Sequence, residues 1–163
     1  MSGRASTHFS VAVHVLTYLA GRGRGRAVSS DELSESANVH PVYIRQVLAP
    51  LRDAQIVRAR RGAHGGWELA RPSADIHLDE IFDLTTSDEP MLATHGPSPE
   101  CSVGREISGI LSALQADVAS AVRAHLRERT VEGLVSDALL AASNRATQQT
   151  DVHPAGVAAA RLP

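Results

Sequence analysis

Two short helical patterns and a glycine-rich turn follow one another between residues 29 and 70. The first helix is expected to begin at Ser29 or Ser30, because a serine side chain accepts a hydrogen bond from the free N–H groups of a helix start. The second begins at Pro41, a residue suited to the first helical turn, and extends to about Ala54. Its apolar residues share one face: Ile44, Val47, Leu48 and Leu51. Pro50 removes a backbone donor within this helix, so we expect a bend there.

A β-hairpin is predicted directly after the second helix. Strands are expected over residues 56–60 and 67–70, and the six residues between them include three glycines. A helix-turn-helix followed by such a hairpin is the pattern of a winged helix, although an ordinary surface turn is the alternative. A helix over residues 8–19, ended by the run GRGRGR, and a short helix over 78–84 complete the prediction. Residues 1–84 are therefore expected to form a winged helix-turn-helix domain.

A long amphipathic helix is predicted over residues 103–127, after an irregular sensor loop over 85–102. At 1.5 Å per residue it is about 38 Å long, so its apolar stripe exceeds what a small domain can cover. We expect it to pair with a second copy; an intramolecular hairpin with the next helix, residues 130–140, is the alternative. Residues 103–141 are thus the dimerisation helices, and 142–163 are expected as a disordered tail. The fold class is mainly α, with a small β-hairpin wing.

Charge is distributed unevenly along the chain. Residues 1–71 contain ten Arg against five Asp and Glu, a balance of +5, whereas residues 72–163 contain six Arg against thirteen acidic residues, a balance of −7. A basic front half favours a polyanionic partner such as nucleic acid. The basic loop over residues 21–26 can reach a phosphate or remain solvated.

The second helix of a helix-turn-helix lies in the major groove of DNA, and its first residues contact base edges. With the apolar face turned inward, the outward residues near its start are Val42, Tyr43, Arg45 and Gln46. Arg45 can donate two hydrogen bonds to guanine, and Gln46 can pair with adenine. Tyr43 can contact a phosphate or a thymine methyl group. An exposed Arg–Gln pair on a helix is also common as a solvated face.

The predicted wing carries a second set of candidate DNA contacts: Arg58, Arg60, Arg61, His64 and Gly65. An arginine at a narrow wing tip can enter the minor groove, where A/T-rich tracts concentrate negative potential. Glycine permits a close approach to the DNA backbone. The alternative is a basic loop that only improves solubility.

Other functional classes find little support in the sequence. No apolar run approaches the roughly 20 residues that cross a bilayer, and the first residues lack a signal-peptide pattern. We therefore expect a cytoplasmic, nucleoid-associated protein without membrane contact. The eight histidines lack metal-ligand spacing, and we find no phosphate loop or nucleophile elbow. We expect neither a metal site nor an enzyme.

The sequence resembles the Rrf-two (Rrf2) family of bacterial regulators, of the IscR/NsrR type. The matching segments are SSDELSESANVHPVYIRQVLAPLRDAQIVRARRGAHGGWELARP, IHLDEIFDLT and ECSVGREI with the helix that follows, and RRGAHGGWELARP is the most specific of them. The resemblance implies a winged helix with a dimerising long helix, and DNA contacts at Val42, Tyr43, Arg45 and Arg61. It also implies a repressor that binds near-palindromic double-stranded operators as a homodimer.

Iron–sulfur members of that family carry three cysteines before the long helix, whereas this chain has one, Cys101. One thiolate per chain is a poor cluster site, so we expect no cofactor. Cys101 lies at the expected helix start, near Arg105, where a thiolate is stabilised and a redox sensor is favoured. The alternative is a small apolar residue that fills a gap. Two further hypotheses stay open: a regulator gated by a small molecule or protein partner, with an inert Cys101, and an interaction module whose wing binds something other than DNA.

Overall fold

The computed structural model describes residues 7–23, 25–62, 64–86, 92, 95–98 and 100–150. Its elements are α1 (His8–Arg22), α2 (Ser30–Ala37), α3 (Pro41–Asp53), β1 (Val57–Arg60), β2 (Gly66–Leu69), the 3-10 turn η1 (Ser73–Asp75), α4 (Leu78–Thr85), α5 (Ser102–Arg127) and α6 (Val131–Thr150). The predicted fold class, mainly α with a small hairpin, is confirmed.

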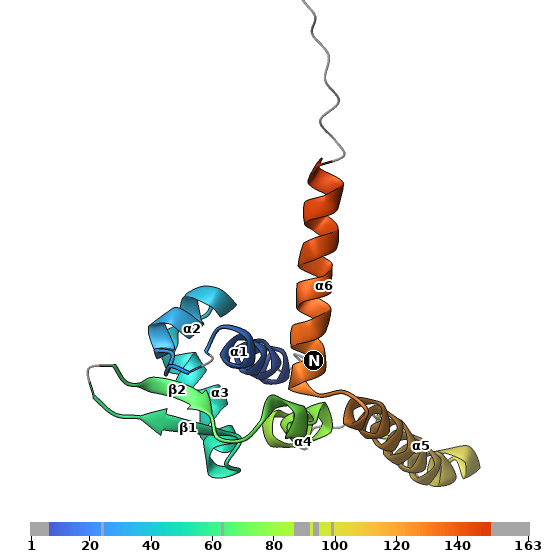
Figure 1. Cartoon of the computed structure of the whole chain (residues 1–163). Coiled ribbons are helices and arrows are strands. Elements are labelled where there is room, and N and C mark those ends of the chain that lie inside the picture. Colours follow the sequence, from blue (N-terminus) through green and yellow to red (C-terminus); the bar gives the residue numbers. More distant parts are fainter. Residues whose placement is uncertain are drawn as a thin grey trace, which may run out of the picture.

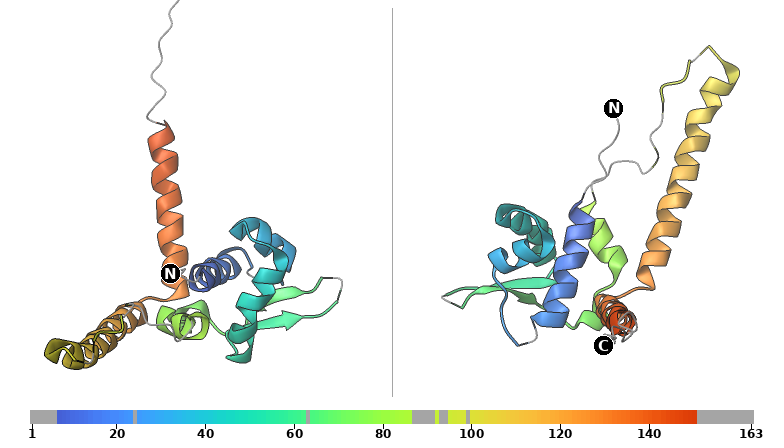
Figure 2. Two further views of the ribbon diagram at one scale, coloured as in Figure 1. Left: turned by 180° about the vertical axis from the view of Figure 1, so that it is seen from behind. Right: turned by 90° about the horizontal axis from the view of Figure 1, so that it is seen from above.

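One hydrophobic core joins α1, α2, α3, α4 and the base of the hairpin (Figure 1). Its largest fully buried side chains include Leu16, Leu33, Leu48, Ile56 and Ile81. With two phenylalanines and one tryptophan in the whole chain, this core is built mainly from aliphatic side chains. α1 runs through the middle of the assembly, so each neighbouring element packs against it (Figures 1 and 2).

The turn between α2 and α3 is defined by local capping contacts. The Ser29 hydroxyl accepts a hydrogen bond from the Glu32 N–H at 3.1 Å, which caps α2 as expected. Asn38 ends α2 in the left-handed conformation, with φ 51° and ψ 49°. His40 Nδ1 then accepts a hydrogen bond from the Val42 N–H at 3.2 Å, and Pro41 opens α3. α3 continues past Pro50 to Asp53.

The wing is a two-stranded antiparallel hairpin with Arg60 opposite Gly66 in its register. A single bridge between Val28 and Trp67 ties β2 to the segment before α2. At Gly66, where φ is +154°, an added Cβ would lie 2.3 Å from the Val28 carbonyl oxygen, so only glycine fits there. Trp67 Nε1 also donates to the Ser30 hydroxyl at 3.0 Å. The wing is therefore anchored to the first helix of the helix-turn-helix.

α1 is longer than predicted, because it continues through Gly21 to Arg22, and Gly23 caps its C-terminal end. The expectation that the glycine run begins the loop at residue 21 is wrong. The Cβ position of Gly21 lies 3.8 Å from Val135 Cγ1, so α6 packs against this turn and supports it. Tertiary packing thus outweighs the low helix propensity of glycine at this point.

α5 and α6 diverge from their shared turn, with α5 along α4 and α6 along α1 (Figures 1 and 2). The Leu78 N–H donates to the Arg129 carbonyl and the Val131 N–H donates to the Ile76 carbonyl, both at 3.0 Å. These bonds hold the turn against the start of α4. The alternative of an intramolecular hairpin between the two helices is therefore wrong.

The last helix differs most from expectation. It was predicted to end near Leu140, but α6 extends to Thr150, so the expectation of a disordered tail is wrong for residues 142–150. This segment is rich in Ala, Gln and other residues that tolerate a helix but lacks an apolar stripe, which is why periodicity missed it. The remaining residues of the expected tail, 151–163, lie outside the described residues. No helix in the described part of the chain is long and apolar enough to cross a membrane.

Candidate nucleic-acid interface

The start of α3 presents an exposed polar face opposite a buried apolar one. Ile44 and Leu48 are fully buried, whereas Arg45 and Gln46 are exposed and Val42 is 48% exposed. The side chains of Arg45 and Gln46 make no hydrogen bond or ion pair with any other residue that the structure describes. The amphipathic pattern of α3 therefore leaves a guanidinium and an amide open to an external partner, as the sequence predicted for this helix.

Tyr43 occupies a more enclosed position than its neighbours on α3. Its ring is half-buried, with its centroid 5.1 Å from that of His8, and its hydroxyl shares a 2.6 Å hydrogen bond with the Thr7 hydroxyl. Tyr43 therefore joins the start of α1 to the start of α3. A DNA contact by its ring edge stays a prediction.

The wing exposes the basic side chains that were predicted on it. Arg60, Arg61 and His64 are exposed, while Arg58 Nε donates to Glu68 Oε1 at 2.8 Å across the hairpin. Gly65 is half-buried, and a Cβ there would lie 2.4 Å from the Arg60 carbonyl oxygen. The close backbone packing of the hairpin tip is thus sufficient to require glycine at this position, whether or not DNA approaches it.

α2, α3 and the wing lie on one side of α1, and α5 and α6 lie on the other (Figures 1 and 2). The candidate residues on α3 and on the wing therefore belong to the same half of the molecule. This arrangement leaves the long helices clear of any ligand that contacts α3 and the hairpin together.

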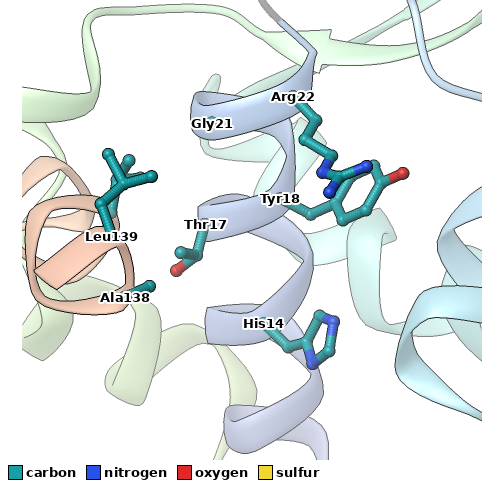
Figure 3. Close-up of a pocket in the computed structure, with 8 residues that line it drawn as sticks. His14, Thr17, Tyr18, Gly21, Arg22, Ala138 and Leu139 are labelled. Carbon is teal, nitrogen blue, oxygen red and sulfur yellow. The ribbon is translucent and has the colours of Figure 1, made fainter. Parts of the chain in front are cut away.

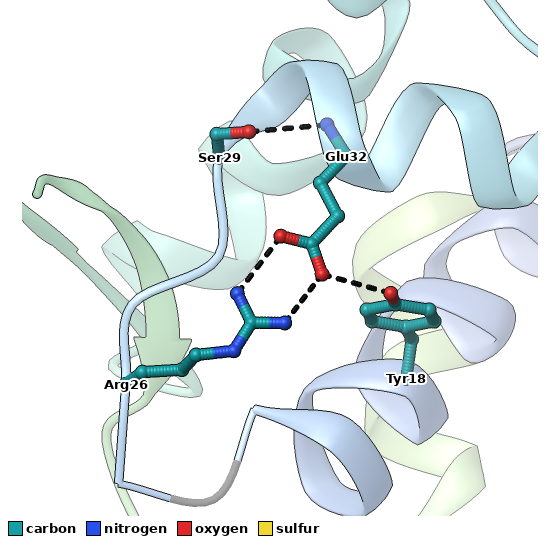
Figure 4. Close-up of polar contacts among 4 residues, drawn as sticks. All are labelled: Tyr18, Arg26, Ser29 and Glu32. Carbon is teal, nitrogen blue, oxygen red and sulfur yellow. Dashed lines mark hydrogen bonds and ion pairs between the residues drawn. The ribbon is translucent and has the colours of Figure 1, made fainter.

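A polar cluster fixes the loop before α2 (Figure 4). The Arg26 guanidinium donates two hydrogen bonds to the Glu32 carboxylate, at 2.5 and 2.8 Å, and the Tyr18 hydroxyl donates to the same carboxylate at 2.8 Å. These donors lower the pKa of Glu32 from its ordinary value of 4.5 to about 2, with Arg26 as the larger cause. The hydrogen bond to Glu32 likewise raises the pKa of Tyr18. Arg26 is therefore engaged with the protein, and sequence analysis had no signal for this cluster.

A family model for Rrf2, described as an iron-dependent transcriptional regulator, matches residues 5–137 of the chain. The chain belongs to the Rrf2 family. With its winged helix-turn-helix, it is a DNA-binding transcriptional regulator of that family.

Relatives and solved structures agree with this membership. A Bacillus subtilis protein named "Putative HTH-type transcriptional regulator YwnA" is 27% identical over 132 residues, which are 80% of this chain and 96% of that protein. The regulator IscR of Cereibacter sphaeroides is 37% identical over 65 residues, 40% of this chain and 42% of its own length. A crystal structure titled as a "putative transcriptional regulator" from Lactobacillus plantarum superposes with a TM-score of 0.72 and 30% identity, covering 89% and 98% of the two chains.

The residues of this Rrf2-family chain do not fit a bound iron centre. Cys101 is its only cysteine and is exposed at the start of α5. Within the described ranges, no three His, Cys, Asp or Glu residues come close enough to hold a metal ion. The iron dependence in the family description therefore finds no ligand set in this part of the chain, and we derive no step through iron.

Cys101 itself caps α5, with its backbone carbonyl accepting a hydrogen bond from the Arg105 N–H at 3.1 Å. The Cys101 side chain is exposed, so it does not fill a gap in the protein interior, which was the alternative to a redox sensor. Much of the loop before it, residues 87–91, 93, 94 and 99, lies outside the described residues. Exposure and a helix N-terminus are both features of reactive thiols.

A shallow groove of about 350 Å³ runs along α1 where α6 packs beside it (Figure 3). Val135, Ala138 and Leu139 of α6 form an apolar wall, and Thr17 lies between the two helices. His14 and Tyr18 of α1 also line the groove, but their side chains point away from α6 (Figure 3), and each already makes a hydrogen bond, to Ser36 and Glu32 respectively. The groove thus offers apolar surface.

Proposed function

We propose that this Rrf2-family regulator reads a near-palindromic operator as a homodimer, with base contacts from the start of α3 and minor-groove contacts from the wing. The proposal rests on the exposed side chains of Arg45 and Gln46, which make no hydrogen bond or ion pair with the described residues. The opposite face of α3 is buried in the core, so these two side chains are held on the surface. The proposed DNA contacts are Val42, Tyr43, Arg45, Gln46, Arg58, Arg60, Arg61, His64 and Gly65.

Genome-wide capture of bound fragments, followed by titration of the captured operator and a scrambled duplex, tests this proposal. We expect Arg45→Ala to weaken operator binding by about 1–3 kcal/mol per half-site, roughly 5- to 150-fold for each, while it weakens scrambled-duplex binding much less. Arg127→Ala, an exposed change at the end of α5, is the matched control. Equal losses on both duplexes would contradict base reading by Arg45.

Pairing of two copies is supported by the exposed apolar surface of α5. None of its 26 residues is buried, and Val103, Ile110 and Leu114 are 66%, 61% and 48% exposed. A helix of about 39 Å with such a stripe is unusual on a free surface, and a second copy of the same helix covers it economically. The two winged helix-turn-helix domains of the dimer are then joined through α5.

The dimer is proposed to act as a repressor in the cytoplasm, where the chromosome is accessible. A dimer seated on a promoter excludes the transcription machinery from the same DNA. A reporter gene placed behind the captured operator tests the sign of regulation. Higher expression without the regulator supports repression, and lower expression contradicts it.

A thiol response at Cys101 is proposed as the signal input, supported by the exposure of Cys101 at the α5 start. Peroxide oxidises the thiolate to a sulfenic acid, which condenses with the thiol of Cys101 of the partner subunit to form a disulfide and release water. Operator affinity and non-reducing electrophoresis before and after peroxide, with Cys101→Ser as the variant, test this step. An identical response in the variant would exclude Cys101 as the sensor.

The groove between α1 and α6 favours a second candidate, a regulator gated by a small apolar molecule. Its volume of about 350 Å³ lies at the lower end of the range for ligand sites. Gly21→Leu would fill it, because the Gly21 Cβ position faces Val135. If an apolar effector released DNA from the wild type and from Cys101→Ser but not from Gly21→Leu, this candidate would replace the thiol response.

A further inference from the structure

An arginine-lined groove of about 730 Å³ lies between the end of α3 and the outer edge of the wing. Val57, Arg58 and Ala59 of β1 all line it, and successive strand residues point to opposite faces. The groove therefore follows the edge of β1. Because β1 pairs only with β2 in this two-stranded sheet, that edge has no strand partner in the described chain.

All charged residues that line the groove in the described part of the chain are basic. Four arginines line it, namely Arg52, Arg58, Arg61 and Arg71, and none of its described lining residues is acidic. In an antiparallel pair, alternate residues direct their backbone N–H and C=O groups away from the partner strand. Exposed guanidinium groups and free backbone N–H groups are the donors that proteins use to bind phosphate oxygens.

The position of the groove links the two predicted DNA-contacting elements. Arg52 lies seven residues after Arg45, two helical turns further along the exposed side of α3. Arg61 lies at the other end, where the wing begins to turn. A DNA strand that leaves the major groove at α3 and passes the wing would cross the surface between these two arginines.

Three of these arginines already contact carboxylates. Arg71 pairs with Glu80, and its side chain is the least exposed of the three. Arg52 pairs with Asp53 at 2.7 Å and Arg58 pairs with Glu68 at 2.8 Å, and the side chains of both arginines are more than half exposed. Exposed ion pairs of this kind contribute little stability. The carboxylates therefore hold the arginines in place but also compete with any anionic ligand.

We propose that this groove binds the phosphodiester backbone of DNA, with Arg52 and Arg58 as phosphate contacts for which Asp53 and Glu68 compete. The inference rests on the proposed DNA-binding function and extends it to Arg52, which sequence analysis did not single out. In this proposal, Arg52 and Arg58 in the groove supply affinity that does not depend on the DNA sequence, and Arg45 contacts the nucleotide bases.

The salt dependence of DNA binding by the full-length protein tests the groove. Each phosphate contact adds about 0.9 to the slope of log affinity against log salt concentration. Arg52→Gln is expected to reduce that slope by about 0.9 per protomer on the operator and on a scrambled duplex alike. Glu68→Gln, which frees Arg58, is expected to strengthen binding to both. Arg123→Gln is the control, because Arg123 also sits in an exposed ion pair, with Asp83, but on the α4–α5 side.

The outcomes separate the two hypotheses. Suppose that the wild type prefers the operator, but that Arg52→Gln leaves the salt slope unchanged and Glu68→Gln leaves the affinity unchanged. This result would contradict phosphate binding in the groove without affecting the proposed function. A wild type without any preference for the operator would overturn the proposed function instead. A third outcome is that the protein binds an extended Glu-rich peptide and that Arg52→Gln abolishes this binding but leaves the salt slope for DNA unchanged. The groove would then be a strand-addition site for a peptide, which would also overturn the proposal. Thermal unfolding of each variant verifies that it is folded.

Discussion

At the scale of single residues, the carboxylate of Glu32 connects segments that are separate along the chain. It joins the loop residue Arg26, the α1 residue Tyr18 and the first turn of α2 (Figure 4). Because the folded protein lowers the pKa of Glu32 to about 2, the stabilisation is complete above its ordinary value of 4.5 and is lost as pH falls toward 2.

Glu32→Gln is therefore expected to cost about 1 kcal/mol of stability at pH 7, a value kept small because the Glu32 and Arg26 side chains are 31% and 50% exposed. The difference from the wild type should vanish as pH falls from about 5 to 2. Urea unfolding at pH 7, 4 and 2 measures this, with Glu35→Gln on the exposed side of α2 as the control. A difference that persists unchanged at pH 2 would contradict the assigned role of the carboxylate.

Gly66 provides a steric prediction at the same scale. A methyl group at Gly66 would lie 2.3 Å from the Val28 carbonyl oxygen, so Gly66→Ala must push apart the bridge that anchors the wing. We expect a loss of about 2–3 kcal/mol in the free energy of unfolding.

Gly62→Ala is the matched control, because Gly62 also has a positive φ, +109°, but its Cβ position has nothing within 4 Å. It should cost only about 1 kcal/mol of backbone strain. Equal losses for the two variants in chemical denaturation would show that the contact with Val28 is unimportant.

At the scale of elements, the angle between α2 and α3 depends on the left-handed residue that ends α2. Asn38 tolerates this conformation, whereas a β-branched residue does not. Asn38→Val is expected to destabilise the protein by about 1–2 kcal/mol and to weaken DNA binding, because α3 would shift relative to the wing. Circular dichroism with urea, together with operator titration, measures both effects.

Asn38→Gly separates the conformation from the side chain, because glycine adopts the left-handed region without steric cost. It should retain stability and affinity close to those of the wild type. If Asn38→Gly were as damaging as Asn38→Val, the Asn38 side chain itself, and not the conformation of the turn, would be responsible.

At the scale of the whole molecule, α5 leaves its apolar stripe without cover in a single chain. If this stripe joins two copies, Leu114→Asp places a charge in the interface and should yield a monomer in analytical ultracentrifugation. The monomer would keep its melting temperature for the winged domain, because Leu114 lies outside the core. Its operator affinity should fall strongly, since one half-site alone supplies half of the contacts.

Ala116→Asp is the control for this prediction. Ala116 is exposed two residues further along α5, which at 3.6 residues per turn points to nearly the opposite side. It should remain a dimer with unchanged affinity. A dimer that survives Leu114→Asp and dissociates with Ala116→Asp would relocate the interface to the other face of α5.

Local signals account for what could be predicted before the structure. The start of α3 follows from Pro41, the cap of α2 from Ser29, and the buried face of α3 from the spacing of Ile44, Val47, Leu48 and Leu51. The hairpin follows from glycines between two short β-rich segments, although β1 begins one residue later than predicted and β2 lies one residue earlier. Each of these rests on interactions within a few residues, which a sequence displays directly.

The amino-acid sequence by itself determined the element types, the inward faces and the basic side chains of α3 and the wing. Only the tertiary structure decided that α1 continues through Gly21 against α6, that α5 and α6 diverge, and that Arg52 meets the edge of β1 in one groove. These features depend on contacts between segments distant along the chain. Their free energies come from burial and charge in three dimensions, which no local pattern of residues specifies.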